Sequence, residues 1–162
     1  AGFVSYWSQP AGRSRPRPVP QYRLGWQDES GTWRDTPASA FTTPFDLDGG
    51  GTLPLPHSRP ELLFDDADRA FVLWRSIETG NRLMLRVLSP PDYDIRDSEA
   101  VVLWDHDLGF YEPVPSRDAW QRDRELVLLV QHCDQKRDHD GTPHAGGTPI
   151  VLARWNHDQL LP

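Results

Sequence analysis

The chain has 162 residues, of which 37% are hydrophobic and 25% are charged, and its formal net charge at pH 7 is −7. The acidic charge argues against a general binder of nucleic acids or anionic membranes. No apolar run approaches the ~18–20 residues of a membrane span, and the single cysteine, Cys133, excludes an intrachain disulfide. Seven Trp, six Phe and four Tyr are too many aromatic residues for a disordered chain, so we expect one soluble domain or part of a larger one.

Strand signals are numerous, and helix signals are nearly absent because sixteen prolines interrupt the stretches with helical spacing. Runs that alternate in polarity, or that are continuously apolar, predict strands. The clearest hairpin joins 71–76 to 82–88 through the turn Glu78-Thr79-Gly80-Asn81. The sequence therefore predicts an all-β fold. In chain order, the expected strands are 2–8, 21–26, 61–64, 70–76, 82–89, 100–104, 124–132 and 148–155.

The segment Asp28-Glu29-Ser30-Gly31-Thr32-Trp33 resembles a degenerate Asp-box, the hairpin turn that recurs in sialidase-like propellers. Asp28 is expected to cap backbone N–H groups, Gly31 to supply a positive φ, and Trp33 to fill the space between two blades. Trp74 and Trp120 also lie among apolar neighbours, and we expect them in the same kind of core. The acidic segment 65–68 is expected to form a solvated turn.

A faint repeat of about fifty residues runs through the second half of the chain, because a strand, a polar turn and a second strand are predicted at 62–74 and again at 111–130. This spacing lies in the range of propeller blades, at ~40–50 residues per blade. The chain then holds about three to four blades, whereas closed propellers typically have 4–8. Either the chain is an incomplete propeller or its architecture is different.

Several short motifs follow one another along the chain. They are Phe3-Val4-Ser5-Tyr6-Trp7, Gln21-Tyr22-Arg23-Leu24-Gly25-Trp26, Phe45-Asp46-Leu47-Asp48-Gly49-Gly50-Gly51-Thr52, Ser58-Arg59-Pro60-Glu61, Tyr111-Glu112-Pro113, Asp118-Ala119-Trp120 and Leu128-Leu129-Val130-Gln131. This ordered set resembles the BNR-repeat family of seven-bladed β-propellers, which includes ulvan lyases and rhamnosyl-glucuronate lyases and hydrolases. The resemblance covers most of the chain, and it matches only the C-terminal part of such a protein.

The resemblance implies that residues 1–162 form a single domain, the C-terminal portion of a β-propeller with sialidase-like blades. The implied partners are an acidic polysaccharide or oligosaccharide and the N-terminal half of the same propeller, which would carry the family's catalytic histidines. Neither nucleic acid nor membrane is expected as a partner, and the implied location is secreted or periplasmic.

The implied reaction is the cleavage of a uronate-containing glycan by β-elimination. The proton next to the uronate carboxylate is weakly acidic, and a guanidinium paired to that carboxylate stabilises the enolate-like transition state. A Tyr or His then removes the proton. The resemblance assigns these catalytic roles to Tyr6 and Arg23, which neighbouring antiparallel strands are expected to bring onto one face. The alternatives are a buried structural Tyr6 and an Arg23 paired to a structural carboxylate.

Three further residues are candidates for substrate binding. Tyr22 lies next to Arg23, and their alternation puts the two side chains on opposite faces of the strand. His57 either contacts a sugar or is an exposed loop histidine. Arg59, which precedes a proline and is therefore expected in extended backbone, either pairs with an internal carboxylate or lines the central cavity.

No cofactor is required by this reaction, and a structural calcium or zinc ion stays an open alternative. His132, Cys133, His139 and His144 have the ligand chemistry of zinc, but their spacing fits no common structural zinc pattern. Asp134, Asp138 and Asp140 have the chemistry of calcium ligands without the phasing of an EF-hand. No metal ligand is therefore assigned.

Three functions compete. The first is the polysaccharide lyase; the second is a non-catalytic carbohydrate-binding propeller, in which exposed Trp and Tyr side chains stack on sugars. The third is glycoside hydrolysis on the same scaffold, which normally needs two carboxyl groups flanking the scissile bond. The unsaturated uronate formed by a lyase absorbs in the near ultraviolet, so one absorbance assay separates the lyase from the other two.

Overall fold

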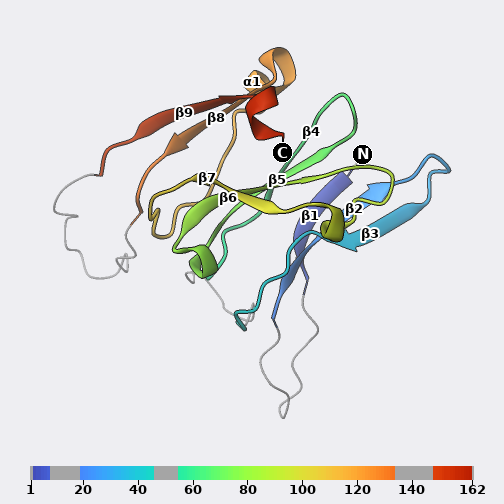
Figure 1. The fold of residues 1–162 in the computed structure, drawn as a ribbon, viewed down its shortest axis with the longest axis horizontal. Coiled ribbons are helices and arrows are strands. Elements are labelled where there is room, and N and C mark those ends of the chain that lie inside the picture. The colour runs from blue at the N-terminus through green and yellow to red at the C-terminus, as the bar shows by residue number, and fades with distance from the viewer. Residues whose placement is uncertain (1, 8–18, 46–54, 134–147, 162) are drawn as a thin grey trace, which may run out of the picture.

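The computed structural model describes residues 2–7, 19–45, 55–133 and 148–161, and for 2–7 it describes the backbone. These residues form three antiparallel sheets in which neighbouring strands follow one another along the chain (Figure 1). The first sheet has the order β1 (Gly2–Trp7), β2 (Gln21–Gln27), β3 (Trp33–Pro37), and the second β4 (Glu61–Phe64), β5 (Ala70–Ser76), β6 (Arg82–Leu88), β7 (Ala100–Trp104). The third pairs β8 (Glu125–Val130) with β9 (Val151–Asn156).

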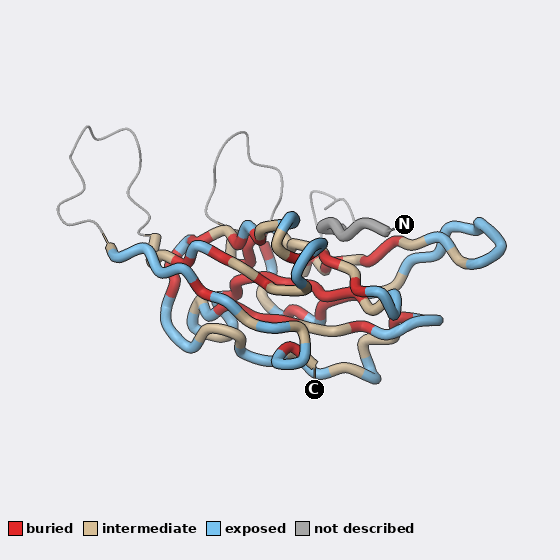
Figure 2. The backbone as a smooth tube through the Cα atoms, turned by 90° about the horizontal axis from the view of Figure 1, so that it is seen from above, coloured by how far each residue is buried: buried red, intermediate tan, exposed pale blue. Residues whose placement is uncertain are grey.

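The second sheet is the middle layer of the molecule, and β5 is buried on both of its faces. Phe71 and Leu73 pack with residues of β8 and β9 in one apolar cluster. Val72 and Trp74 alternate with them and pack with residues of β2 in a second cluster. Figure 2 shows buried segments running through the centre of the molecule with exposed turns at its ends. The continuously apolar run from Ala70 to Trp74 is the pattern expected for such double burial.

The predicted hairpin between β5 and β6 is confirmed. The two strands pair in continuous register from Ala70 opposite Leu88 to Ser76 opposite Arg82. The connection contains the short 3-10 helix η1 (Ile77–Thr79), whose first turn is capped by the Ser76 side chain accepting the N–H of Glu78. Gly80 ends η1 with a φ of +70°, which a glycine adopts without steric cost. Local turn chemistry and strand pairing therefore agree here.

One α-helix was missed by the sequence analysis. α1 (Arg117–Asp123) starts at Ser116, whose hydroxyl accepts the N–H of Ala119, and ends at Arg124, which has a φ of +53°. Trp120 is its buried residue, and the indole Nε1 donates to the Phe64 carbonyl at 2.6 Å. A helix of seven residues with one apolar anchor shows no apolar periodicity, so its capping serine was the available signal. The 3-10 helices η2 (Ile95–Asp97) and η3 (His157–Leu160) complete the fold.

Some of the expected elements and burial positions are confirmed by the structure, and others are wrong. The all-β class is confirmed, since strands dominate the described residues, but β3 was not predicted. Trp74 and Trp120 are buried as expected, whereas the expectation for Trp33 is wrong, because 56% of that residue is exposed. Asp65 was expected to be solvated and is instead buried, because it accepts hydrogen bonds from its own turn and from His157. Over the described ranges, no helix is long and apolar enough to cross a membrane.

Two of these tryptophans give a direct test of the layered core. Trp120→Ala should lower the free energy of unfolding by about 3–5 kcal/mol, as expected for truncating a buried aromatic side chain. Trp33→Ala should lower it by less than about 1 kcal/mol, because most of that side chain is already in water. Urea denaturation of the two variants measures the difference; equal losses would show that the layers do not pack as described.

Candidate functional site

The outward face of the first sheet carries polar and aromatic side chains from β2 and β3. In β2, Tyr22 and Leu24 are fully buried while Arg23 between them is partly exposed, so the predicted alternation is confirmed. Directly paired residues of antiparallel strands lie on the same face. The register therefore adds residues of β3 to the face of Arg23. We define the Arg23 face as Arg23, Gln27, Trp33 and Asp35.

Arg23 is held across the sheet by Asp35. Asp35 pairs with Gly25, two residues along β2 from Arg23, and its Oδ2 accepts a hydrogen bond from Arg23 Nε. Gly25 has no side chain, so the guanidinium has a clear path between the two positions. The Arg23 side chain is 30% exposed and that of Asp35 is 61% exposed. The bond to Asp35 thus fixes the direction of a planar, partly exposed guanidinium.

Trp33 stands opposite Gln27, at the end of the face formed by the β2–β3 hairpin. The hairpin turn is built by Asp28, whose Oδ1 accepts the N–H groups of Ser30 and Thr32. The Ser30 hydroxyl and the Arg34 guanidinium also bind this carboxylate, and together they lower its pKa to about 2. Gly31 has a φ of +78°. The capping roles expected from the Asp-box pattern are thus confirmed, but the turn presents its tryptophan outward.

The structure does not bring Tyr6 and Arg23 together on one face. Tyr6 is the cross-strand partner of Tyr22, whereas Arg23 is the partner of Ser5. Since paired positions share a face and successive positions alternate, the register positions of Tyr6 and Arg23 are on opposite faces of the sheet. The side chain of Tyr6 itself lies outside the described part of the structure. The expectation that both act from one face is therefore corrected.

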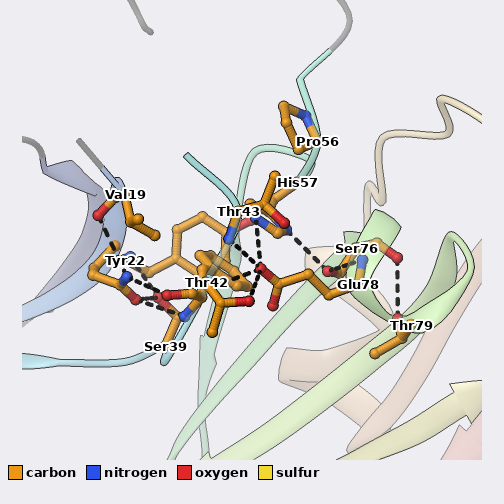
Figure 3. A network of polar contacts seen from close by, with 12 residues as sticks. Val19, Tyr22, Ser39, Thr42, Thr43, Pro56, His57, Ser76, Glu78 and Thr79 are labelled. Carbon is orange, nitrogen blue, oxygen red and sulfur yellow. Dashed lines mark hydrogen bonds and ion pairs between the residues drawn. The ribbon is translucent and has the colours of Figure 1, made fainter. Parts of the chain in front are cut away.

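Tyr22 and His57 do converge, in a buried polar network between the first two sheets (Figure 3). The Tyr22 hydroxyl donates to the Ser58 carbonyl at 2.6 Å, and its ring meets Phe41 edge-on with centroids 4.8 Å apart. The His57 ring stacks on the same Phe41 ring, with the two ring centroids 3.6 Å apart. Both Tyr22 and His57 are 0% exposed, so a glycan cannot reach them in this arrangement, and the expected exposed loop histidine is buried instead.

His57 also belongs to a set that resembles a catalytic triad. Its Nδ1 lies 2.9 Å from the Ser76 hydroxyl, and its Nε2 lies 3.9 Å from Glu78 Oε1. However, Ser76 is buried and its hydroxyl already accepts the N–H of Glu78 as the cap of η1. Glu78 Oε1 in turn accepts the N–H groups of Thr42 and Thr43. The set therefore connects two loops, and its His57 and Ser76 are buried among the described residues.

Arg59 is exposed, and its backbone N–H donates to Glu112 Oε2 at 2.7 Å. Burial raises the pKa of the Glu112 carboxyl, against the lowering effect of that hydrogen bond. A carboxylate therefore lies beside Arg59, but it is bound by the backbone N–H, so this contact tests neither of the two alternatives for the Arg59 side chain.

A group that sequence reasoning missed lines an open cavity of about 330 Å³. Its residues are Asp65, Asp66, Ala67, Arg69, Arg124 and His157. Asp65 and His157 are 92 positions apart in the chain and within hydrogen-bond distance in space. No local pattern joins them, so only the tertiary structure reveals this group, which we call the Asp65 cavity.

Within the described residues, no group of three or more His, Cys, Asp or Glu side chains is arranged to hold a metal ion. Of the zinc candidates, His132 places Nδ1 2.8 Å from the Asp107 carbonyl, and Cys133 donates from Sγ to the Gln131 carbonyl at 3.7 Å. Asp134, Asp138, His139, Asp140 and His144 lie outside the described residues.

The comparisons with known proteins add no relative. No protein-family model matches the chain, and no curated protein matches it. The candidate site therefore stands on its own geometry.

The buried His57 predicts a pH dependence of stability. Burial lowers its pKa to about 4, while a histidine in the unfolded chain titrates near ~6.5. Between these values the unfolded state binds more protons, so the free energy of unfolding falls as the pH is lowered from ~6.5 to ~4. The full effect is on the order of 3 kcal/mol.

The measurement is denaturant unfolding of the wild type and His57→Gln between about pH 7 and pH 4. The difference between the two curves should shrink as the pH falls, because only the wild type has to accommodate a proton on residue 57. Parallel curves over this range would show that His57 is not the group responsible.

Proposed function

We propose that the Arg23 face recognises an acidic glycan and that the three stacked sheets are blades of a β-propeller that cleaves a uronate-containing polysaccharide. The observation that carries the recognition step is the combination, on one antiparallel face, of the exposed Trp33 ring with the oriented Arg23 guanidinium. An aromatic ring offers a sugar an apolar stacking surface. A guanidinium offers a carboxylate two parallel donors.

Each residue of the face then has a defined part in binding. Trp33 stacks on the apolar side of a sugar ring. Gln27 is opposite it and donates from Nε2 to the Gly31 carbonyl at 3.1 Å, so its Oε1 is the atom that accepts a sugar hydroxyl. Arg23 pairs with the uronate carboxylate, while Asp35 holds its Nε and fixes its direction. Because the β2–β3 turn is tied by several hydrogen bonds to Asp28, little ordering of the hairpin is needed on binding.

The propeller proposal is supported by the way the sheets follow one another. β4 to β7 form a four-stranded antiparallel meander, which is the composition of a propeller blade. The sheets before and after it in the chain cover its two faces. We propose that the N-terminal half of the same propeller supplies the remaining blades, and that the whole protein acts on its glycan as a secreted or periplasmic enzyme.

For β-elimination, the Arg23 face supplies the carboxylate partner and another residue supplies the base. Arg23 stabilises the enolate-like charge that develops next to the uronate carboxylate. Since the register position of Tyr6 is on the opposite face, we propose that the proton is removed by a group from another blade. If the face binds glycan without forming an unsaturated product, the protein is a non-catalytic binding propeller or a glycoside hydrolase.

Binding to a glucuronate-containing oligosaccharide tests the recognition step. Arg23→Lys keeps the charge and loses the planar fork, so we expect the affinity to fall about tenfold or more. Trp33→Ala removes the stacking surface and should also weaken binding at least about tenfold. Isothermal titration calorimetry measures both. The matched control is Arg154→Gln, which removes an exposed arginine of β9 that is paired to Glu125 in the third sheet.

The control should bind as the wild type does. Equal affinity of wild type, Arg23→Lys and Trp33→Ala would refute the assignment of this face. Ultraviolet absorbance of the reaction mixture, measured with the complete propeller, then separates elimination from binding alone and from hydrolysis.

The proposed partner blades predict how the chain behaves by itself. The outward face of the third sheet exposes Leu129, which pairs with Leu152, a residue that is also exposed. We expect the isolated chain to self-associate through such surfaces, and Leu129→Lys to reduce the association. Light scattering after size-exclusion chromatography measures the mass, with Val114→Lys as a control at another exposed apolar residue. A cooperatively folding wild-type monomer would count against the missing blades.

A further inference from the structure

The Asp65 cavity lies where three segments meet: the turn between β4 and β5, the end of α1 and the start of η3. Its walls are tied together by the tertiary structure. The His157 N–H donates to the Arg124 carbonyl, and the His157 ring lies against the rings of Phe71 and Trp120. The cavity therefore has a built wall of packed side chains.

The Asp65 carboxylate is saturated by donors. Its Oδ1 accepts the N–H groups of Ala67 and Arg69, and its Oδ2 accepts Arg69 Nε at 2.7 Å and His157 Nε2 at 3.0 Å. The carboxyl is buried, which by itself would raise its pKa, but these hydrogen bonds lower it. Asp65 is thus ionised, and its negative charge is stabilised by hydrogen-bond donors of the protein itself.

The hydrogen bond to Asp65 places a proton on Nε2 of the His157 ring. Because Nε2 donates its proton to Asp65, it cannot also accept the Arg69 Nη2 group that lies 3.4 Å away. The other ring nitrogen, Nδ1, lies 3.4 Å from the carboxylate of Asp158, which is 98% exposed. Protonation of His157 therefore adds a positive charge at the cavity without disturbing the bond to Asp65.

Arg69 has donors left over. Its Nε is taken by Asp65, and among the described residues its Nη groups have no oxygen acceptor, since the contact of Nη2 is to the His157 nitrogen. The second arginine of the cavity, Arg124, is paired with Asp66 and with the Trp120 carbonyl. The cavity thus contains a partly buried guanidinium whose Nη groups can donate hydrogen bonds to a bound anion.

The charges that face His157 favour an anion when the ring is protonated. Asp65 and Asp66 balance Arg69 and Arg124, so the cavity lining is neutral with a neutral His157 and carries one positive charge with a protonated one. Asp158, whose carboxylate lies 3.4 Å from His157 Nδ1, adds one negative charge outside the lining, so protonation of His157 brings the net charge of all these groups from −1 to zero and weakens the repulsion of an anion.

We propose that the Asp65 cavity binds a small oxyanion, such as the carboxylate of a sugar acid or a sulfate group, through the Nη donors of Arg69, and that protonation of His157 strengthens the binding. This site is separate from the Arg23 face, so either proposal stands if the other fails. Its ligand is selected by the planar fork of one arginine and by the histidine charge.

Calorimetric titration of the full chain with sodium glucuronate, sodium sulfate and glucose tests the proposal. Both anions or one of them should bind saturably and glucose should not; the anion that binds identifies a sugar carboxylate or an inorganic oxyanion as the ligand. Binding should be several-fold tighter at about pH 5.5 than at about pH 8, because protonation of a histidine is favoured at the lower pH. Both probes keep their charge in this range.

Two variants and a control complete the test. Arg69→Lys should weaken anion binding about tenfold or more, because the lysine lacks the fork. His157→Gln should keep the binding seen at about pH 8 and lose its increase at low pH. Arg96→Gln removes an arginine paired to Asp94 in an exposed turn and should bind as the wild type does. The proposal is overturned if neither anion binds saturably, or if Arg69→Lys and Arg96→Gln bind equally well.

Discussion

The double burial of β5 is the constraint on which the rest of the structure depends. All seven of its residues are buried, and the strand ends in two polar ones, Arg75 and Ser76. Arg75 is only 1% exposed, and its guanidinium donates to the carbonyls of Leu55, Pro56 and Tyr111 and to the Asn81 side chain. Ser76 binds His57 and caps η1. The burial of a charged group thus orders the loops on both sides of the central sheet.

This layering decides where chemistry can take place. The inward face of the first sheet is committed to the core, so Tyr22 and His57 are structural although their residue types are those of binding sites. The outward face is left with Arg23 and Trp33. The second candidate, the Asp65 cavity, lies at the junction of the second and third sheets, where the ends of separate elements meet. Both sites therefore lie at the margins of a core that is closed.

The sequence predicted elements well where local and tertiary preferences agree. The β5–β6 hairpin combines apolar strands with a glycine turn, and its position was confirmed. α1 was missed because one buried Trp120 produces no periodic pattern. Trp33 was misplaced because a tryptophan at a strand end is compatible with either a core or a surface, and only the position of neighbouring sheets separates the two. Asp65 was misplaced because His157, one of its hydrogen-bond partners, lies 92 residues away.

The sequence by itself determined the all-β class, most of the strands and the alternation that separates Arg23 from Tyr22, since these depend on the period of two between neighbouring residues in a strand. The tertiary structure alone decided which face of each sheet is covered. It also decided that the register positions of Tyr6 and Arg23 are on opposite faces of the first sheet, and that His157 contacts Asp65. The physical reason is that burial and register arise from contacts between segments far apart in the chain, and a local sequence pattern carries no information about which segments will meet.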